Sequence, residues 1–339
     1  MNDPDRSPLY QLGTISVLVC AAALTACASI GRHAITPAPL PAAVAAQRQP
    51  TWDEVFAHPT ELTVVAYNTG VVLTGPRILI DAGDVHTPAA AKVEQWVPSL
   101  SYLVRHPRQG AFLMDAGMRV ADAKGRCDFG AKPFFWASCQ TEPGQDVASQ
   151  LRNDGVDPAS LRFVLMSHLH GDHAGGLHAL GAAGPLRLLM AQEEWTAASR
   201  AMRLVDGYIS TLLDGPFEVA YLPMERAVEM PLVGRALDLF GDGAVWVLPM
   251  PGHTRGELAV LLNATSGPLL FTFDTAHLRA NLDHGVIPGF TVDKVAAKSA
   301  VGHLNALRAA YPNIRVFYGH EPTQWANQPR RAILTNTDP

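Results

Sequence analysis

The sequence predicts an α/β protein in which two β-sheets pack together and helices cover them on the outside. Short apolar runs rich in β-branched or aromatic residues recur along the chain. Most are bounded by Gly, Pro, Asn or Asp, as strands usually are. With 28 Gly and 26 Pro among 339 residues, turns are frequent and the elements between them are short. A hydrophobic fraction of 48% provides for a substantial buried core and excludes a disordered chain.

The apolar runs and the stretches between them give the expected elements. Strands are expected at residues 62–67, 77–80, 102–104, 111–114, 163–166, 186–190, 244–248, 258–262, 269–273 and 314–318. Helices are expected at residues 145–153, 192–205 and 292–310. Thr291 is a candidate N-cap for the last helix. In that helix, Val301, Leu304 and Leu307 are spaced to form one buried face.

The overall charge argues against a nucleic-acid partner. The chain carries 26 Lys and Arg against 31 Asp and Glu, which gives a formal net charge of -5. Proteins that bind a phosphate backbone depend on a broad positive surface, and this composition does not supply one. We therefore expect no nucleic acid among the partners.

The N-terminal segment has the anatomy of an export signal. Residues 12–24 form an uncharged, largely apolar run that is shorter than the roughly 20 residues needed to span a bilayer, and this length suits the core of a signal peptide. The run ends in Leu24-Thr25-Ala26-Cys27, which resembles the bacterial lipobox, where lipoproteins are cleaved before a Cys that is lipidated. The alternative is an ordinary hydrophobic N-terminal helix.

The predicted organisation has three parts. Residues 1–26 are expected to be a lipoprotein-type signal peptide, residues 27–50 an extended tether rich in Ala and Pro, and residues 51–339 one folded domain. Lipidation at Cys27 would anchor an exported, periplasmic domain to a membrane, which we expect to be the outer membrane.

Two cysteines, Cys127 and Cys139, lie in the body of the chain. Exported proteins meet an oxidising environment, in which two thiols 12 positions apart can form a disulfide. Such a disulfide contributes roughly 3 kcal/mol in the chain-entropy model. The alternative is a pair of buried free thiols.

Potential metal ligands are concentrated directly after the apolar run at 163–166, in His168-Leu169-His170-Gly171-Asp172-His173. In an extended segment alternate residues face the same side, so His168, His170 and Asp172 can converge on one point. A turn into a helix would bring His173 into the same pocket. Imidazole and carboxylate groups at this density are suitable ligands for Zn²⁺ or another divalent metal.

Three further candidate ligands each stand just past an apolar run, where a sheet presents side chains at one edge. His253 lies in Pro251-Gly252-His253-Thr254, Asp274 follows the run at 269–273, and His320 lies in Tyr318-Gly319-His320-Glu321. These residues would complete two metal sites.

The histidine and aspartate motif, followed in order by His253, Asp274 and His320, resembles the metallo-β-lactamase superfamily. The resemblance covers nearly the whole body of the chain. It implies an αββα sandwich of two packed mixed β-sheets flanked by helices, with two divalent metal ions, expected to be zinc, at one edge. Asp115 matches an early strand-end Asp of the family, which usually supports the metal loop without binding metal.

The resemblance also assigns roles to single residues. It places the first metal on His168, His170 and His253, the second on Asp172, His173 and His320, and Asp274 between the two. Two such ions lower the pKa of a shared water, so that a bridging hydroxide can attack a substrate carbonyl. Asp172 could carry a proton to the leaving oxygen. His277 stands where similar lactonases often place a Tyr that contacts the substrate carbonyl, and it could donate a similar hydrogen bond.

Features outside the ligand set distinguish branches of this superfamily. The β-lactamases proper generally lack the bridging Asp, and several use a Cys ligand, whereas no Cys follows Cys139 here. Glyoxalases of the second type share the ligands but add a helical region for glutathione, which we do not expect in the 19 residues after His320. The chain looks most like N-acyl homoserine lactonases and related organophosphate hydrolases. Its intervals of 21 and 46 residues between the last three ligands are close to the lactonase layout.

The long stretch between Asp115 and residue 145 carries Phe134, Phe135 and Trp136. We expect this loop, pinned by the two body cysteines, to overhang the metals and supply an apolar wall of the substrate pocket. The alternative is that these aromatic side chains pack the loop onto the body of the domain.

The predicted function is a membrane-tethered, dinuclear zinc hydrolase that opens lactones of the N-acyl homoserine lactone type. The alternatives within the superfamily are an organophosphate or aryl ester hydrolase and a β-lactamase-like hydrolase. A metal-stabilised lipoprotein without catalytic activity fits the sequence less well, because structural zinc sites are usually closed cages of four ligands and need no bridging carboxylate.

Overall fold

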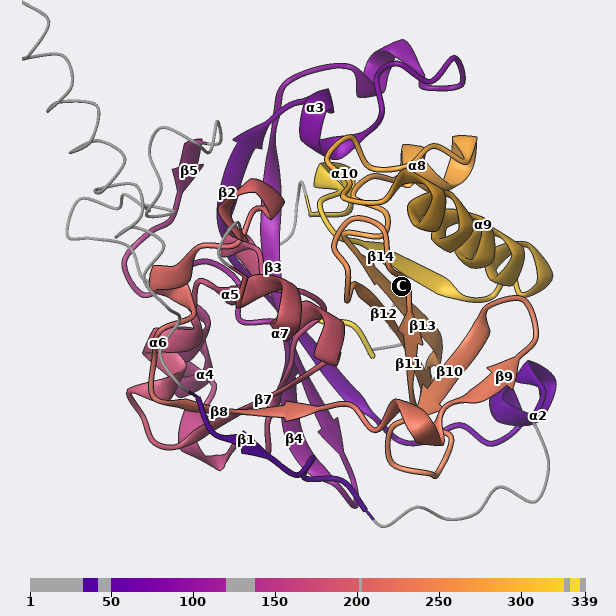
Figure 1. Cartoon of the computed structure of the whole chain (residues 1–339). Helices are drawn as coiled ribbons and strands as arrows, with labels where there is room; N and C mark the ends of the chain where they lie inside the picture. The colour runs from indigo at the N-terminus through magenta and orange to yellow at the C-terminus, as the bar shows by residue number, and fades with distance from the viewer. Residues whose placement is uncertain (1–32, 42–49, 120–137, 201–202, 326–329, 336–339) are drawn as a thin grey trace, which may run out of the picture.

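The computed structural model describes residues 33–41, 50–119, 138–200, 203–325 and 330–335. They form two β-sheets that pack face to face, with helices on the outer faces (Figure 1). This arrangement confirms the predicted αββα sandwich. Within the described part of the chain, no helix is long and apolar enough to cross a membrane.

The first sheet is mixed, and its strands lie in the order β1-β8-β7-β6-β4-β3-β2-β15, with β5 also paired to β2. Its strands are β1 (Ile35–Thr36), β2 (Thr63–Thr74), β3 (Gln95–His106), β4 (Gly110–Met114), β5 (Ser138–Gln140), β6 (Val164–Leu165), β7 (Leu186–Met190), β8 (Phe217–Tyr221) and β15 (Arg331–Ile333). From β4 to β1 neighbouring strands are parallel, so β4 and β6 end at the same edge.

The second sheet has the order β14-β13-β12-β11-β10-β9. Its strands are β9 (Val228–Met230), β10 (Gly234–Asp238), β11 (Val245–Pro249), β12 (Leu258–Ala264), β13 (Gly267–Phe273) and β14 (Arg315–Tyr318). Because β12 is antiparallel to both its neighbours and β14 is parallel to β13, the strands β11, β13 and β14 all run in one direction. Their ends therefore present the next residues of the chain at one edge.

Short helices cover both sheets. The α-helices are α2 (Trp52–Phe56), α3 (Pro76–Leu79), α4 (Val147–Asn153), α5 (Gly171–Ala174), α6 (Leu177–Gly181), α7 (Gln192–Ala198), α8 (Arg279–His284), α9 (Lys294–Ala310) and α10 (Pro322–Trp325). The 3-10 helices are η1 (Ala89–Ala91), η2 (Pro158–Ser160), η3 (Arg203–Asp206), η4 (Ser210–Leu212) and η5 (Met224–Arg226). Helices α4, α6 and α7 pack on the first sheet, and α2 and α9 pack on the second.

The core lies in three layers because strand side chains alternate between faces. In β2, Val64 and Ala66 join the layer between the two sheets, whereas Val65 and Tyr67 join the layer under the helices. The buried face of α9 lies on the second sheet and includes the predicted residues Val301, Leu304 and Leu307.

Most predicted elements are found, and three details are wrong. The helix expected at 192–205 ends at Ala198 as α7, and Arg203–Asp206 form the separate 3-10 helix η3. Residues 77–80 are not a strand, because Gly75 caps helix α3 and Pro76, at its first position, has a φ angle already suited to a helix. Thr291 does not cap α9. The cap is Asp293, whose side chain accepts hydrogen bonds from the backbone N–H groups of Val295 and Ala296. The other predicted strands all fall on observed strands.

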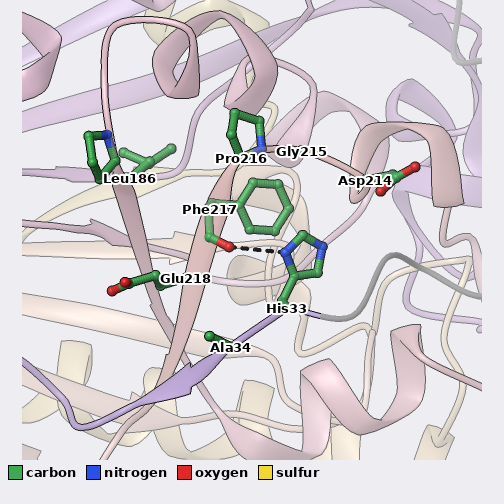
Figure 2. Close-up of a pocket in the computed structure, with 9 residues that line it drawn as sticks. His33, Ala34, Leu186, Asp214, Gly215, Pro216, Phe217 and Glu218 are labelled. Atoms are coloured by element: carbon green, nitrogen blue, oxygen red, sulfur yellow. Dashed lines mark hydrogen bonds between the residues drawn. The ribbon is translucent and has the colours of Figure 1, made fainter.

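Part of the segment that we expect to be a tether lies against the domain. Strand β1 pairs in parallel with β8. Just before it, the His33 ring stacks on Phe217 with ring centroids 4.2 Å apart, beside a hollow of about 320 Å³ (Figure 2). The two ring nitrogens of His33 lie 3.0 Å and 2.8 Å from the carbonyl oxygens of Phe217 and Leu213. The domain thus holds this segment through the backbone pairing of β1 and through the side chain of His33.

Helix α9 closes on the loop that carries His253, and Gly252 is the point of contact. Gly252 has a φ angle of 150°, and a Cβ added there would lie 2.4 Å from the Cα and N atoms of Ala297. We predict that Gly252→Ala lowers the free energy of unfolding by more than about 2 kcal/mol, because it adds both a clash and a strained φ angle.

The control for this substitution is a glycine within α9, the helix that Gly252 contacts. Gly302 is exposed, and an added Cβ would meet nothing within 4 Å. Gly302→Ala should raise the free energy of unfolding by about 0.5–1 kcal/mol, because Ala favours a helix interior more than Gly does. Urea unfolding of the metal-free variants measures both values, and equal effects of the two substitutions would contradict the proposed contact.

Candidate metal centre

The histidine motif begins just past the end of β6 and runs into helix α5. Residues 167–170 are outside regular structure, and His170 is the N-cap of α5. This geometry matches the expected turn into a helix, which directs Asp172 and His173 back toward His168. All three histidines of the motif are buried, whereas the Asp172 side chain is 19% exposed.

The structure brings all seven predicted ligands together. One group has its potential ligand atoms within 4.8 Å of one another and consists of His168, His170, His253 and Asp274. A second group meets the same limit and consists of Asp172, His173 and His320. These groups coincide with the two predicted metal sites, with Asp274 beside both.

Asp274 stands between the two groups. Its Oδ1 lies 3.2 Å from Nε2 of His173 and 3.1 Å from Nε2 of His320. Its Oδ2 lies 3.5 Å from Nε2 of His168 and 3.3 Å from Nε2 of His253. Each carboxylate oxygen thus faces one group, as expected of a bridging ligand.

These distances fit metal ions better than direct hydrogen bonds. Ligand atoms about 2.0–2.1 Å from a zinc ion lie about 2.9–3.4 Å from one another at tetrahedral or octahedral angles. Within the described residues, Nε2 of His168, Nε2 of His173 and Oδ1 of Asp274 are buried and have no hydrogen-bond partner. Buried polar atoms are rarely left without partners, so this cluster is suited to two divalent cations.

The ring nitrogens that face away from the cluster are held by acceptors. Nδ1 of His253 lies 2.8 Å from the Phe290 carbonyl oxygen, and Nδ1 of His320 lies 2.8 Å from that of Pro98. In His170 it is Nε2 that lies 2.9 Å from a carbonyl oxygen, that of Asp206. Because a carbonyl only accepts, each of these nitrogens carries the hydrogen and the other nitrogen offers its lone pair to the centre.

Burial and charge give the ligands different proton affinities. Burial lowers the pKa of His168 well below its usual value and that of His170 to about 3. Burial also acts on His173, but nearby carboxylates, Asp274 first, outweigh it and raise the pKa of His173 well above the usual value. Imidazole neighbours, His320 first, outweigh burial at Asp274 and hold its pKa well below the usual range. The centre therefore offers an ionised carboxylate at Asp274 and neutral imidazoles at His168 and His170, the forms in which these groups bind metal.

Known proteins share both this sequence pattern and this fold. The family model described as Metallo-beta-lactamase superfamily matches residues 95–320, which is more than half of the chain. The chain belongs to the metallo-beta-lactamase superfamily. One relative in it, the N-acyl homoserine lactonase AttM of Azorhizobium caulinodans, is 28% identical over 234 residues, covering 68% of this chain and 84% of the relative. An N-acyl homoserine lactonase of a Bacillus species is 24% identical over 255 residues, covering 73% and 91%.

Solved structures of this superfamily resemble the chain in fold. An N-acyl homoserine lactone hydrolase with the product N-hexanoyl-L-homoserine at its catalytic metal centre aligns with a TM-score of 0.62 and 19% identity, covering 80% of this chain and 97% of the other. AidC, described as a dizinc quorum-quenching lactonase, aligns with a TM-score of 0.53 and 16% identity, covering 81% and 91%. At these identities the comparison establishes the shared fold.

Asp115, the strand-end Asp that matches the superfamily pattern, holds two of the metal ligands in place through hydrogen bonds. Its carboxylate accepts hydrogen bonds from Nδ1 of His173 at 2.7 Å, from the Ser167 hydroxyl at 2.7 Å and from the Ser167 backbone N–H at 2.7 Å. The Ser167 oxygen lies 3.0 Å from Nδ1 of His168 and can accept its hydrogen. Asp115 thereby orients two ligands without reaching the metal position.

Two buried glutamates that the sequence did not reveal also support this superfamily site. Glu194, on α7, accepts hydrogen bonds from the backbone N–H groups of Leu169 and Gly256 and so joins the loops of two ligands. Glu257 accepts from the Asp274 backbone N–H at 3.2 Å and lies 3.4 Å from Nδ1 of His168. Burial raises the pKa of both glutamates. Neither glutamate has a spacing in the sequence that relates it to the motif.

Of the remaining predicted site residues, the structure describes His277 and Cys139, and the others lie outside the described ranges. His277 joins the cluster, with Nε2 3.0 Å from Oδ2 of Asp274. The predicted pocket residues Phe134, Phe135 and Trp136, together with Cys127 and Cys27, lie outside the described residues. Cys139 is disulfide-bonded, in agreement with the expectation that it does not carry a free thiol.

The role of Asp115 leads to a prediction about metal affinity. Asp115→Asn should weaken zinc binding by about 10–100-fold, because it removes the acceptor that fixes His173 and Ser167. Competition with a chromophoric chelator measures the affinity. Asp238→Asn is the matched control, since Asp238 accepts from the N–H groups of Gly241 and Gly243 in a turn without ligands. An equal loss in both variants would contradict the orienting role.

Proposed function

We propose that this protein is a dinuclear metal-dependent hydrolase that opens lactones, with N-acyl homoserine lactones as the substrate class. The observation that carries the proposal is the convergence of five imidazoles and two carboxylates into two adjacent groups that share Asp274. The relatives named N-acyl homoserine lactonase support the choice of substrate class.

The protein side chains prepare the site for hydrolysis of a cyclic ester. Two divalent ions bound there would lower the pKa of water and polarise a carbonyl group. The imidazoles of His253 and His320 are fixed by backbone carbonyl acceptors, and that of His173 by the Asp115 carboxylate, so the site needs little rearrangement when a substrate enters. In the reaction a water oxygen forms a bond to the lactone carbonyl carbon, the ring carbon–oxygen bond breaks, and a hydroxy acid results.

Asp172 is the side chain best placed to move the proton. It is the most exposed member of the ligand set, and its Oδ2 lies 3.4 Å from Nε2 of His320. Its backbone carbonyl accepts a hydrogen bond from the Ser99 hydroxyl at 2.6 Å, which fixes the residue. The carboxylate can take the proton of the attacking water and deliver it to the departing ring oxygen, so that no proton is gained or lost overall.

Aromatic side chains on one side of the first group can contact an apolar acyl chain. The half-buried ring of Phe290 lies 5.8 Å from the rings of both His170 and His253. The buried ring of Tyr208 lies 5.5 Å from that of His170. Phe134, Phe135 and Trp136 are the further side chains that we propose for this wall.

We also propose that the enzyme is an exported lipoprotein, anchored to the outer membrane through Cys27 and facing the periplasm. The support comes from the apolar run at 12–24 and the lipobox-like sequence that ends it. The disulfide at Cys139 suits an oxidising compartment, since such bonds are rare in a reducing cytosol.

The proposed activity predicts which substrates are hydrolysed and which changes abolish their hydrolysis. Protein carrying two zinc ions per chain should open N-acyl homoserine lactones, and removal of the metal should abolish the reaction. Asp172→Asn should lower kcat by about 10²-fold or more, because the carboxylate that transfers the proton is lost. Asp157→Asn, at the cap of η2, should leave kcat unchanged. A protein that opens no lactone would contradict the proposal. Cleavage of aryl phosphotriesters would then favour an organophosphate hydrolase, and cleavage of β-lactams a β-lactamase-like hydrolase.

The proposed anchor predicts how the protein is processed. Cys27→Ser should abolish both the incorporation of fatty acid and the cleavage of the leader, because the thiol that accepts the lipid is lost. Labelling of a bacterial host with a radioactive fatty acid and the mass of the protein measure these two changes. Cys20→Ser is the matched control, as Cys20 lies within the apolar run. A wild-type protein without incorporated fatty acid would refute the anchor.

A further inference from the structure

His277 is held in the cluster in the same way as the predicted ligands. It lies between Asp274 and helix α8 and is fully buried. Its Nε2 lies 3.0 Å from Oδ2 of Asp274, and among the described residues it has no hydrogen-bond partner. The ring also lies 5.0 Å from the ring of His253 and 5.3 Å from that of His320.

The hydrogen of the His277 ring is fixed on the side away from the cluster. Nδ1 lies 3.1 Å from the Leu79 carbonyl oxygen, which can only accept. The side-chain amide of Asn281 donates to the same oxygen at 3.3 Å and helps to hold it in place. The neutral ring therefore carries its hydrogen on Nδ1 and directs the Nε2 lone pair at a carboxylate oxygen. Two lone pairs repel each other at this distance unless a cation lies between them.

The same arrangement occurs at two of the predicted ligands. His253 and His320 also place Nδ1 against a backbone carbonyl oxygen and Nε2 near Asp274. The separation of 3.0 Å between Nε2 of His277 and Oδ2 of Asp274 falls within the spacing of about 2.9–3.4 Å expected for two atoms bound to one ion. One ligand atom each from Asp274, His277 and His320 lies within 4.8 Å of the others.

We propose that His277 is an additional histidine ligand, which joins Asp274 in binding one of the two metal ions. The proposal rests on the metal pair of the proposed hydrolase. It replaces the expectation that His277 donates a hydrogen bond to the substrate carbonyl, because its only hydrogen in the neutral state is engaged by Leu79. The pair would then be held by six imidazoles and two carboxylates.

Metal binding by the His277→Gln variant tests the proposal. The amide of Gln can still donate a hydrogen bond to a substrate, but it is a much poorer metal ligand than imidazole. We expect the affinity for the more weakly held zinc ion to fall more than about tenfold, as measured by chelator competition. In the Co²⁺-loaded protein the visible absorption should change in intensity, because one ion loses a ligand and its geometry changes.

A second buried histidine provides the control. His106 is buried, and its Nε2 lies 3.0 Å from Oδ2 of Asp242, but it stands at the opposite end of β3 and β4 from Asp115. His106→Gln should leave both the zinc affinity and the Co²⁺ absorption unchanged. Thermal unfolding of the metal-free variants identifies any general loss of stability. If His277→Gln lowers stability, the Co²⁺ absorption of the folded fraction still reports the ligand.

The His277→Tyr variant separates the two roles of this position. A neutral phenol keeps a hydrogen-bond donor for the substrate but removes the imidazole ligand, so we expect the same loss of zinc affinity as in His277→Gln. Zinc affinity and Co²⁺ absorption equal to wild type in both variants would overturn the proposal. These measurements need no substrate, so they stand even if the wild-type protein, with two metal ions bound, fails to open any lactone and the proposed function is wrong.

Discussion

The buried carboxylate of Asp274 is the feature on which the rest of the site depends. Its two oxygens face five imidazole nitrogens at 3.0 to 3.5 Å, and the residue is almost inaccessible to water. Burying an anion and polar ring nitrogens without partners costs several kcal/mol, so cations bound between them would offset that cost. Metal binding therefore contributes to the stability of this edge of the sandwich as well as to its chemistry.

The sandwich delivers these groups because strands of both sheets end at one edge, and the chain bends sharply at two of these ends. Asp115 follows β4 with a φ angle of 57°, and Phe273 precedes Asp274 with a φ angle of 43°, where the pairing of β13 with β14 also shifts register. Such conformations cost about 1–3 kcal/mol each in residues other than Gly. Hydrogen bonds of the Asp115 carboxylate to Ser167 and His173, and of Glu257 to the Asp274 backbone, offset this strain and fix the direction of each carboxylate.

The sequence was sufficient to predict the sandwich and the ligand cluster, because both leave local patterns. Apolar runs mark most of the strands, and each ligand stands directly after such a run or in the motif from His168 to His173. Glu194 and Glu257 could not be predicted, since they act through backbone groups that only the fold brings near. The prediction of a strand at 77–80 failed because a few apolar residues suit either structure, and the Gly and Pro before them decided for a helix. For His277, spacing indicated the position, but the role depends on the Leu79 carbonyl, almost 200 residues away in sequence.

The contact of residues 33–36 with the domain indicates which side of the domain would face the membrane if Cys27 is lipidated. His33 stands only six positions after Cys27, so at most about 20 Å of extended chain separates the anchor from the folded body. His33 lies beside Leu186 and Phe217, the residues at which β7 and β8 begin. The metal ligands follow the ends of β6 and of the strands in the second sheet, and β6 is parallel to β7. An anchored domain would therefore present the beginnings of the parallel strands to the membrane and the metal centre to the aqueous side, where a diffusing substrate can reach it.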